Sequence, residues 1–306
     1  YADQDRKNSI YLLHGHGWAG SIYGCTMKAA IALVIVSLFI IACQLPEKEN
    51  HFHALTFDPT EPGVLYVATH YYLEKHQEEG SKRIGSFGED YMGFVIAKDG
   101  TFYSSGHSLS IQNVGIRKSI DKGKTWQILK YEGLDFHDMA ISYADQNLMY
   151  AWSTPPEELL VVSRDAGQQW EEVDTDFRQD LYVLAADHQQ ENKLYAGTLL
   201  GLFMSNDYGK TWMEQEKVKN ITVLAIADDP LTEGVMYLST FSRGVLKTVD
   251  SGKSWEEINQ GLPASEENPL LFLTINPHNT KEVLGFTRHS EVFKYNGEEW
   301  KSIKLG

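Results

Sequence analysis

The chain of 306 residues contains only two cysteines, Cys25 and Cys43. No cysteine follows Cys43, which excludes disulfides and zinc sites built from thiolates in the rest of the chain. Positive charge is also scarce: 27 Lys and Arg face 42 Asp and Glu, giving a formal net charge of −15. Such an acidic chain argues against nucleic acid or anionic lipid as a partner. No helical apolar period of useful length appears after Cys43, which argues against a helical fold.

Long apolar runs are likewise rare, and the main one lies near the N-terminus. It extends from Ala29 to Ala42, follows Met27 and Lys28, and ends at Cys43. The run is shorter than the roughly 20 residues that span a bilayer, but it suits the core of a signal peptide. Its ending, "IIAC", resembles the lipobox of bacterial lipoproteins, which implies a lipid on Cys43.

This pattern predicts four segments. Residues 1–26 form an upstream segment outside the mature protein, and residues 27–42 a lipoprotein signal peptide. Residues 43–50 form the lipidated cysteine with a short tether, and residues 51–306 the folded domain. We therefore expect a protein anchored through Cys43 to the extracytoplasmic face of a bacterial cell membrane.

Four short stretches of the remaining chain share the pattern S/T-x-D-x-G-x-x-W. They are SIDKGKTW, SRDAGQQW, SNDYGKTW and TVDSGKSW, and their aspartates, 42 to 44 residues apart, are Asp121, Asp165, Asp207 and Asp250. The aspartate can accept hydrogen bonds from backbone N–H groups two or three residues later, which closes a tight turn. Glycine permits a positive φ, and the tryptophan offers a large apolar face. These roles predict structural turns, because a single active site would not require four copies of the same turn.

Between these turns, each unit begins with a short apolar segment that favours a β-strand. The segments are His53–Phe57, Met92–Ile96, His137–Ile141, Tyr182–Ala186, Thr222–Ile226 and Leu271–Ile275. A unit of about 44 residues has the length of a four-stranded propeller blade. The sequence therefore predicts an all-β fold, a single β-propeller of six four-stranded blades, with seven blades as the alternative.

The four turns resemble the Asp-box, or BNR repeat, of sialidases, sortilin-like receptors and photosystem assembly factors. In that family the box joins the third and fourth strands of a blade, on the face away from the ligand. The stretches HFHALTFDP, LYVATH and DYMGFVIAKDGTFYSSGH resemble more closely a group of bacterial lipoproteins labelled BNR-repeat glycosyl hydrolases. Sialidases require three arginines around the substrate carboxylate, whereas here only Arg243 and Arg288 fall at ligand-side loops. The resemblance therefore implies a protein that is not a typical sialidase.

Aligning the units places distant residues at equivalent positions around the propeller axis. The position two residues before each first segment holds His51, Asp90, Asp135, Asp180, Asn220 and Pro269. The first position of each segment holds His53, Met92, His137, Tyr182, Thr222 and Leu271, and the position after each second strand holds His70, His107, Thr154, Leu199, Phe241 and Arg288. All three sets of positions belong to the end of the propeller opposite the boxes, so the histidines and aspartates of the first three units should converge there.

Imidazole and carboxylate groups together suit a divalent metal such as zinc or copper, or acid–base chemistry near neutral pH. The predicted ligand-binding residues are His51, His53, His70, Asp90, His107, Asp135 and His137, with the five histidines as metal ligands. Any one of these residues alone could equally be ordinary turn chemistry. The first alternative is a glycoside hydrolase, with Asp90, Asp135 and Asp180 as candidate catalytic carboxylates. The second is a non-enzymatic assembly or scaffold factor. The expected partners are a small molecule, a glycan or a surface protein.

Overall fold

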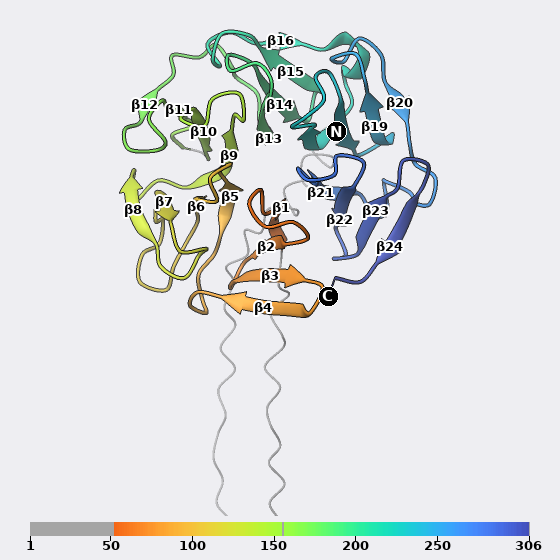
Figure 1. Cartoon of the computed structure of the whole chain (residues 1–306). Helices are drawn as coiled ribbons and strands as arrows, with labels where there is room; N and C mark the ends of the chain where they lie inside the picture. The colour runs from red at the N-terminus through yellow and green to blue at the C-terminus, as the bar shows by residue number, and fades with distance from the viewer. Residues whose placement is uncertain (1–51, 155, 306) are drawn as a thin grey trace, which may run out of the picture. The chain divides into compact units, whose positions relative to one another are not determined.

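The computed structural model describes residues 52–154 and 156–305. They form six separate four-stranded antiparallel sheets arranged around a common axis (Figure 1). The first three sheets are β1–β4 (Phe52–Phe57, Leu65–Thr69, Leu73–Gln77, Gly80–Ile84), β5–β8 (Met92–Ile96, Phe102–Ser105, Ile116–Ser119, Gln127–Lys130) and β9–β12 (Phe136–Ile141, Met149–Ser153, Leu160–Ser163, Glu171–Glu172). The other three are β13–β16 (Leu181–Ala186, Leu194–Thr198, Leu202–Ser205, Met213–Glu214), β17–β20 (Val223–Asp228, Met236–Thr240, Gly244–Thr248, Glu256–Glu257) and β21–β24 (Leu270–Ile275, Val283–Thr287, Val292–Tyr295, Trp300–Ile303).

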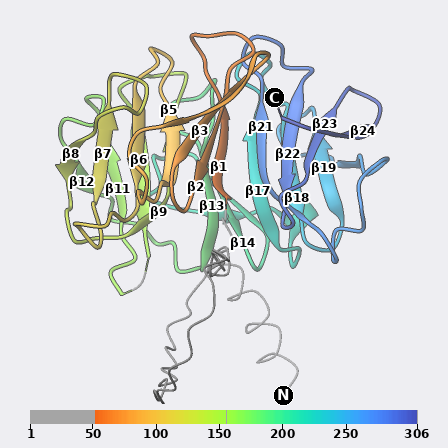
Figure 2. The same ribbon diagram turned by 90° about the horizontal axis from the view of Figure 1, so that it is seen from below.

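This arrangement confirms the predicted six-bladed propeller and excludes the seven-bladed alternative. The first strand of each sheet is the innermost, and each inner strand contacts the inner strands of both neighbouring blades. In the side view the blades stand side by side with their strands roughly along the axis (Figure 2). One short 3-10 helix, η1 (Glu216–Val218), lies between β16 and β17. Within the part of the chain that the structure describes, no helix is long and apolar enough to cross a bilayer.

The ring closes by side-chain packing between the first and last blades. Each blade is built from four consecutive strands, so neither end of the described chain adds a strand to the other end's blade. Leu55 and Phe57 of β1 pack with Phe286 of β22 in one apolar cluster. At the same seam, His278 Nε2 lies 3.0 Å from the backbone oxygen of Asp58.

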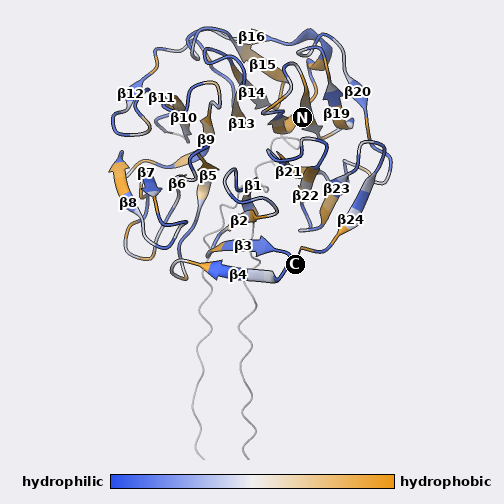
Figure 3. Ribbon diagram, viewed as in Figure 1, coloured by the Kyte–Doolittle hydropathy of each residue, from blue (hydrophilic) through white to orange (hydrophobic). Residues whose placement is uncertain are grey.

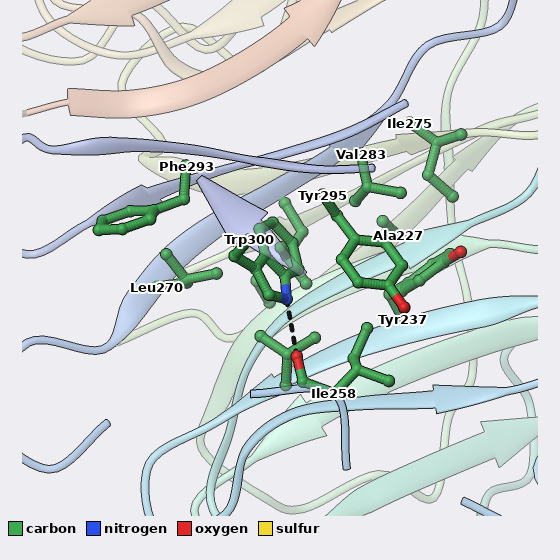
Figure 4. Packing of buried hydrophobic residues seen from close by; sticks show 12 residues of the cluster. Ala227, Tyr237, Ile258, Leu270, Ile275, Val283, Phe293, Tyr295 and Trp300 are labelled. Carbon is green, nitrogen blue, oxygen red and sulfur yellow. Dashed lines mark hydrogen bonds between the residues drawn. The ribbon is translucent and has the colours of Figure 1, made fainter. Parts of the chain in front are cut away.

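Apolar clusters between adjacent blades form the core. The cluster between the fifth and sixth blades surrounds Trp300, which is 1% exposed (Figure 4). Its indole Nε1 donates a hydrogen bond of 2.7 Å to the backbone oxygen of Ile258, so the polar atom of this buried ring has a partner. Apolar residues lie mostly within the blades, while hydrophilic residues predominate in the connecting loops (Figure 3).

Each of the four predicted turns joins the third and fourth strands of its blade. They share the hydrogen bonds accepted by the aspartate and by the Ser or Thr side chain, and in the first three the tryptophan also donates to the glycine oxygen. In Ser205–Trp212, Asp207 Oδ1 accepts a hydrogen bond from the backbone N–H of Thr211 at 2.9 Å. Ser205 Oγ accepts another from the N–H of Gly209, and Trp212 Nε1 donates to the Gly209 oxygen. Both Tyr208 and Gly209 have positive φ, 63° and 84°, so the turn needs two left-handed residues where the sequence suggested one. The geometry supports the structural role predicted for these turns.

We expect Asp207→Ala to lower the free energy of unfolding by about 1–2 kcal/mol, because it leaves several turn donors without an acceptor. Chemical denaturation of this variant beside Glu266→Ala, a change at an exposed site, measures the effect. Ligand binding at the opposite end of the propeller should not change. A variant of normal stability that had lost ligand binding would place the turn in the functional site instead.

Candidate metal centre

Six of the predicted residues lie together at one end of the propeller, where inner strands begin and second strands finish. His53 lies on β1 and His70 follows β2. In the next two blades Asp90 precedes β5, His107 follows β6, and Asp135 and His137 lie at the start of β9, with Asp135 immediately before it. Backbone hydrogen bonds fix these junctions: Asp90 N–H donates to the His107 oxygen at 2.8 Å, and Thr154 N–H donates to the Asp135 oxygen at 2.8 Å.

The most compact part of the group is formed by His53, His70 and Asp90, which we call the triad. His53 Nε2 lies 3.1 Å from His70 Nδ1 and 3.3 Å from Asp90 Oδ1. His70 Nδ1 lies 3.3 Å from Asp90 Oδ2. Donor atoms bound tetrahedrally to one zinc ion at about 2.0–2.1 Å are about 3.3 Å apart. The triad therefore has donor spacings close to those of a metal site.

Asp90 is the centre of the whole group. Its side chain contacts His53, His70 and His107, and the residue is only 5% exposed. Asp90 Oδ1 is buried, makes no hydrogen bond of standard geometry with the residues that the structure describes, and lies 3.3 Å from His53 Nε2. Burying a carboxylate is costly unless a cation or proton compensates its charge, so the chemistry of Asp90 fits a bound cation.

A buried arginine holds the backbone of Asp90 in place. Arg117 of β7 is 3% exposed and donates from Nη2 to the Asp90 oxygen at 2.8 Å. Its Nη1 donates to Glu89 Oε2, and its guanidinium lies 4.7 Å from the ring centre of Tyr91. Gly106 packs so closely that a Cβ there would lie 2.3 Å from the Asp90 oxygen. These contacts fix the backbone position of Asp90 and thereby help to orient its carboxylate.

The second part of the group is His107, Asp135 and His137. His107 lies between the two aspartates, with Nδ1 3.0 Å from Asp90 Oδ2 and Nε2 3.7 Å from Asp135 Oδ2. His137 Nε2 lies 2.8 Å from the same Asp135 oxygen. The hydrogen bond with Asp90 raises the pKa of His107 above its usual value, and burial partly opposes this. Burial also opposes ionisation of Asp135, but His137 and His107 together hold the pKa of its carboxyl below the usual range.

One predicted residue, Asp180, is not part of this group in the structure. Asp180 is exposed at the start of β13, and no hydrogen bond or ion pair joins it to the group among residues 52–154 and 156–305. His51 lies outside the described residues, as does Cys43. The turn residues Asp121, Asp165, Asp207 and Asp250 follow third strands and therefore lie at the opposite end of the propeller, as predicted.

An apolar rim borders the triad. His70 contacts the ring of Tyr71 edge-on at 5.3 Å, and Tyr71 stacks on Phe87 with ring centres 5.8 Å apart. Phe87 and Leu109 are 69% and 87% exposed. The donor atoms of the triad are thus approached over a surface that combines polar groups with aromatic faces.

Two partly buried titratable residues, Asp228 and His188, lie at the other end of the inner strands and were not predicted from the sequence. Asp228 ends β17 at the position where the other inner strands end in Phe, Ile or Ala, and burial raises its pKa to about 8. Its Oδ2 accepts the backbone N–H of His188 at 2.8 Å. The His188 ring stacks on Tyr143 at 4.3 Å, and burial lowers its pKa to about 4. The alignment of the units placed Ile226 at this position, two residues before Asp228, and therefore gave no signal for the aspartate.

Comparison with known proteins supports the fold and does not extend to function. The sequence matches no protein-family profile and has no significant match among curated proteins. The structure is similar to an ancestral GH74 enzyme (TM-score 0.60, 15% identity, covering 83% of this chain and 38% of that one). It is also similar to the GH74 xyloglucanase from Xanthomonas campestris, with a TM-score of 0.59 and 16% identity, covering 81% of this chain and 46% of that one. A third similar structure is YCF48 from Cyanidioschyzon merolae, with a TM-score of 0.54 and 12% identity, covering 84% of this chain and 87% of that one. The chain thus spans less than half the length of these two GH74 enzymes, and at such identities the similarity shows the propeller fold alone.

Proposed function

We propose that this protein binds a divalent transition metal ion, zinc or copper, through His53, His70 and Asp90. The observation that carries the proposal is the convergence of one donor atom from each residue within 4.8 Å of one another. The three residues come from two blades and three chain segments, so the fold and not local sequence brings them together. Two imidazoles and a carboxylate are ligands that zinc and copper accept readily.

The environment of the triad favours a site that exchanges ligands with solvent. The side chain of His70 is 45% exposed, whereas that of Asp90 is 7% exposed. A metal ion bound to the buried carboxylate of Asp90 would keep a coordination position open on its solvent-exposed side. Sites with three protein ligands and an open position are typical of metal centres that bind a further ligand. We therefore propose that the ion captures a small molecule, a glycan or a group on a surface protein.

The proposed setting is the extracytoplasmic face of a bacterial membrane, with the lipid on Cys43 as the anchor. The triad begins only ten residues after that cysteine. A tether of this length reaches at most about 35 Å when fully extended. The proposed site would thus work close to the membrane that carries it.

Glycoside hydrolysis remains the second candidate, because Asp90 and Asp135 lie on either side of the His107 ring. A hydrolase needs one carboxylic acid free to protonate the leaving group. Asp90 is buried and surrounded by three histidines, which suits a metal ligand better than an acid catalyst. A pure scaffold role is the third candidate, and it does not explain why the histidines lie together. Hydrolysis of glycans that persists after exhaustive chelation would favour the second candidate.

We expect His70→Ala to weaken zinc binding at least about 100-fold, since it removes one of three protein ligands. Isothermal titration of the compact unit Glu47–Gly306, stripped with a chelator, measures the affinity. His289→Ala is the matched control, because His289 is an exposed histidine in the β22–β23 turn at the same end of the propeller. Equal zinc affinity in the two variants would contradict the assignment of His70.

A further inference from the structure

The histidine and aspartate group is larger than one metal ion requires. Beyond the triad it continues into the third blade through His107, Asp135 and His137. His107 links the triad to the third blade, because its two ring nitrogens contact different carboxylates. Nδ1 is 3.0 Å from Asp90 Oδ2, and Nε2 is 3.7 Å from Asp135 Oδ2.

The two carboxylate oxygens of Asp135 have very different surroundings. Its Oδ2 is shared by His107, His137 and the hydroxyl of Thr154, which lies 3.3 Å away. Its Oδ1 is buried and accepts no hydrogen bond from the described residues. The carboxylate therefore has one oxygen surrounded by donors and one buried oxygen with none, which a cation would balance.

We propose that His107, Asp135 and His137 form a second divalent cation site beside the triad, so that the propeller holds two ions. This inference rests on the proposed function of the triad and extends it. The donors would be His107 Nε2, the Asp135 carboxylate and His137 Nε2. Asp135 Oδ2 lies 3.7 Å and 2.8 Å from the two nitrogens. Among the described residues only the triad has three donor atoms within 4.8 Å of one another, so the two imidazoles of the second site would have to move closer together to share one ion.

The position of His107 Nδ1 explains how the two sites fit together. A metal-bound histidine almost always donates its other ring N–H to a carboxylate, which fixes the tautomer and the ring orientation. With Nε2 on the second ion, His107 Nδ1–H would donate to Asp90, itself a ligand of the first ion. Each site would thus orient a ligand of the other. The occupant is a divalent ion that accepts nitrogen and oxygen donors, with zinc as the probe.

The test counts zinc ions per chain in Glu47–Gly306 after equilibrium dialysis, by elemental analysis. We expect two ions in the unaltered protein and in His289→Ala. One ion should remain in His137→Ala, in which the triad is intact. Asp135→Asn, which preserves shape, should also retain one ion, and it substitutes for His137→Ala if that variant does not fold.

The possible outcomes separate the two proposals. One ion in the unaltered protein and one in both third-blade variants would leave the triad in place and overturn the second site. Two ions in all of these proteins would also overturn it, since the second ion would then lie elsewhere. No bound zinc in the unaltered protein would instead reject the proposed function, and the second site with it.

Discussion

Asp90→Asn is expected to abolish high-affinity zinc binding while leaving the propeller folded. The change preserves the shape of the side chain but replaces an anionic ligand with a neutral amide. Because Asp90 contacts His53, His70 and His107, the loss affects the triad and the orientation of His107 together. We expect a loss of affinity of well over 100-fold, larger than for any single histidine.

Competition with a chelator of known affinity measures this loss. Thermal unfolding of the metal-free proteins provides the control, since the midpoint of Asp90→Asn should be close to or above that of the unaltered chain. A midpoint that is not lowered is expected because the substitution removes a buried charge and keeps the size of the side chain. Zinc affinity retained in Asp90→Asn would exclude Asp90 as a ligand.

Trp300→Ala is expected to cause the largest loss of stability, about 3–5 kcal/mol. Trp300 is almost completely buried between the fifth and sixth blades, and the change leaves a cavity beside Tyr295 and Ile258. It also leaves the Ile258 oxygen without its indole donor. Since this blade forms the seam with the first blade, the loss should weaken closure of the ring.

Urea denaturation followed by circular dichroism measures this effect, with Val249→Ala as the control at a site that is 64% exposed. The control should change the free energy of unfolding by less than about 0.5 kcal/mol. A loss of under 1 kcal/mol in Trp300→Ala would mean that the sixth blade contributes little to the cooperative unit.

The repeat made most of the fold predictable from the sequence. The spacing of the four turns set the blade length, and the alternation of apolar residues placed the inner strands within a residue or two of their observed bounds. Equivalent positions in neighbouring blades then had to lie side by side, which is why His53, His70, Asp90, His107, Asp135 and His137 could be grouped from sequence alone. Asp180 shows the limit, because an equivalent backbone position does not fix where a side chain makes its contacts.

Other features depended on tertiary packing and left weaker signals in the sequence. Arg117 supports Asp90 from β7, the third strand of the same blade, and no spacing rule connects residues 27 positions apart across a sheet. Asp228 ends its inner strand where the other blades have an apolar residue, but the sequence alignment placed Ile226 at that position. The division of the histidine group into a compact triad and a looser second set likewise required atomic distances.

The central claim is that one metal ion binds among His53 Nε2, His70 Nδ1 and the Asp90 carboxylate. A crystal of the zinc-loaded propeller, with anomalous diffraction recorded on both sides of the zinc edge, tests this claim most directly. The account predicts an anomalous peak at about 2.0–2.2 Å from all three donors. A fully zinc-loaded crystal with no peak at the triad, and zinc bound only at other residues, would contradict it.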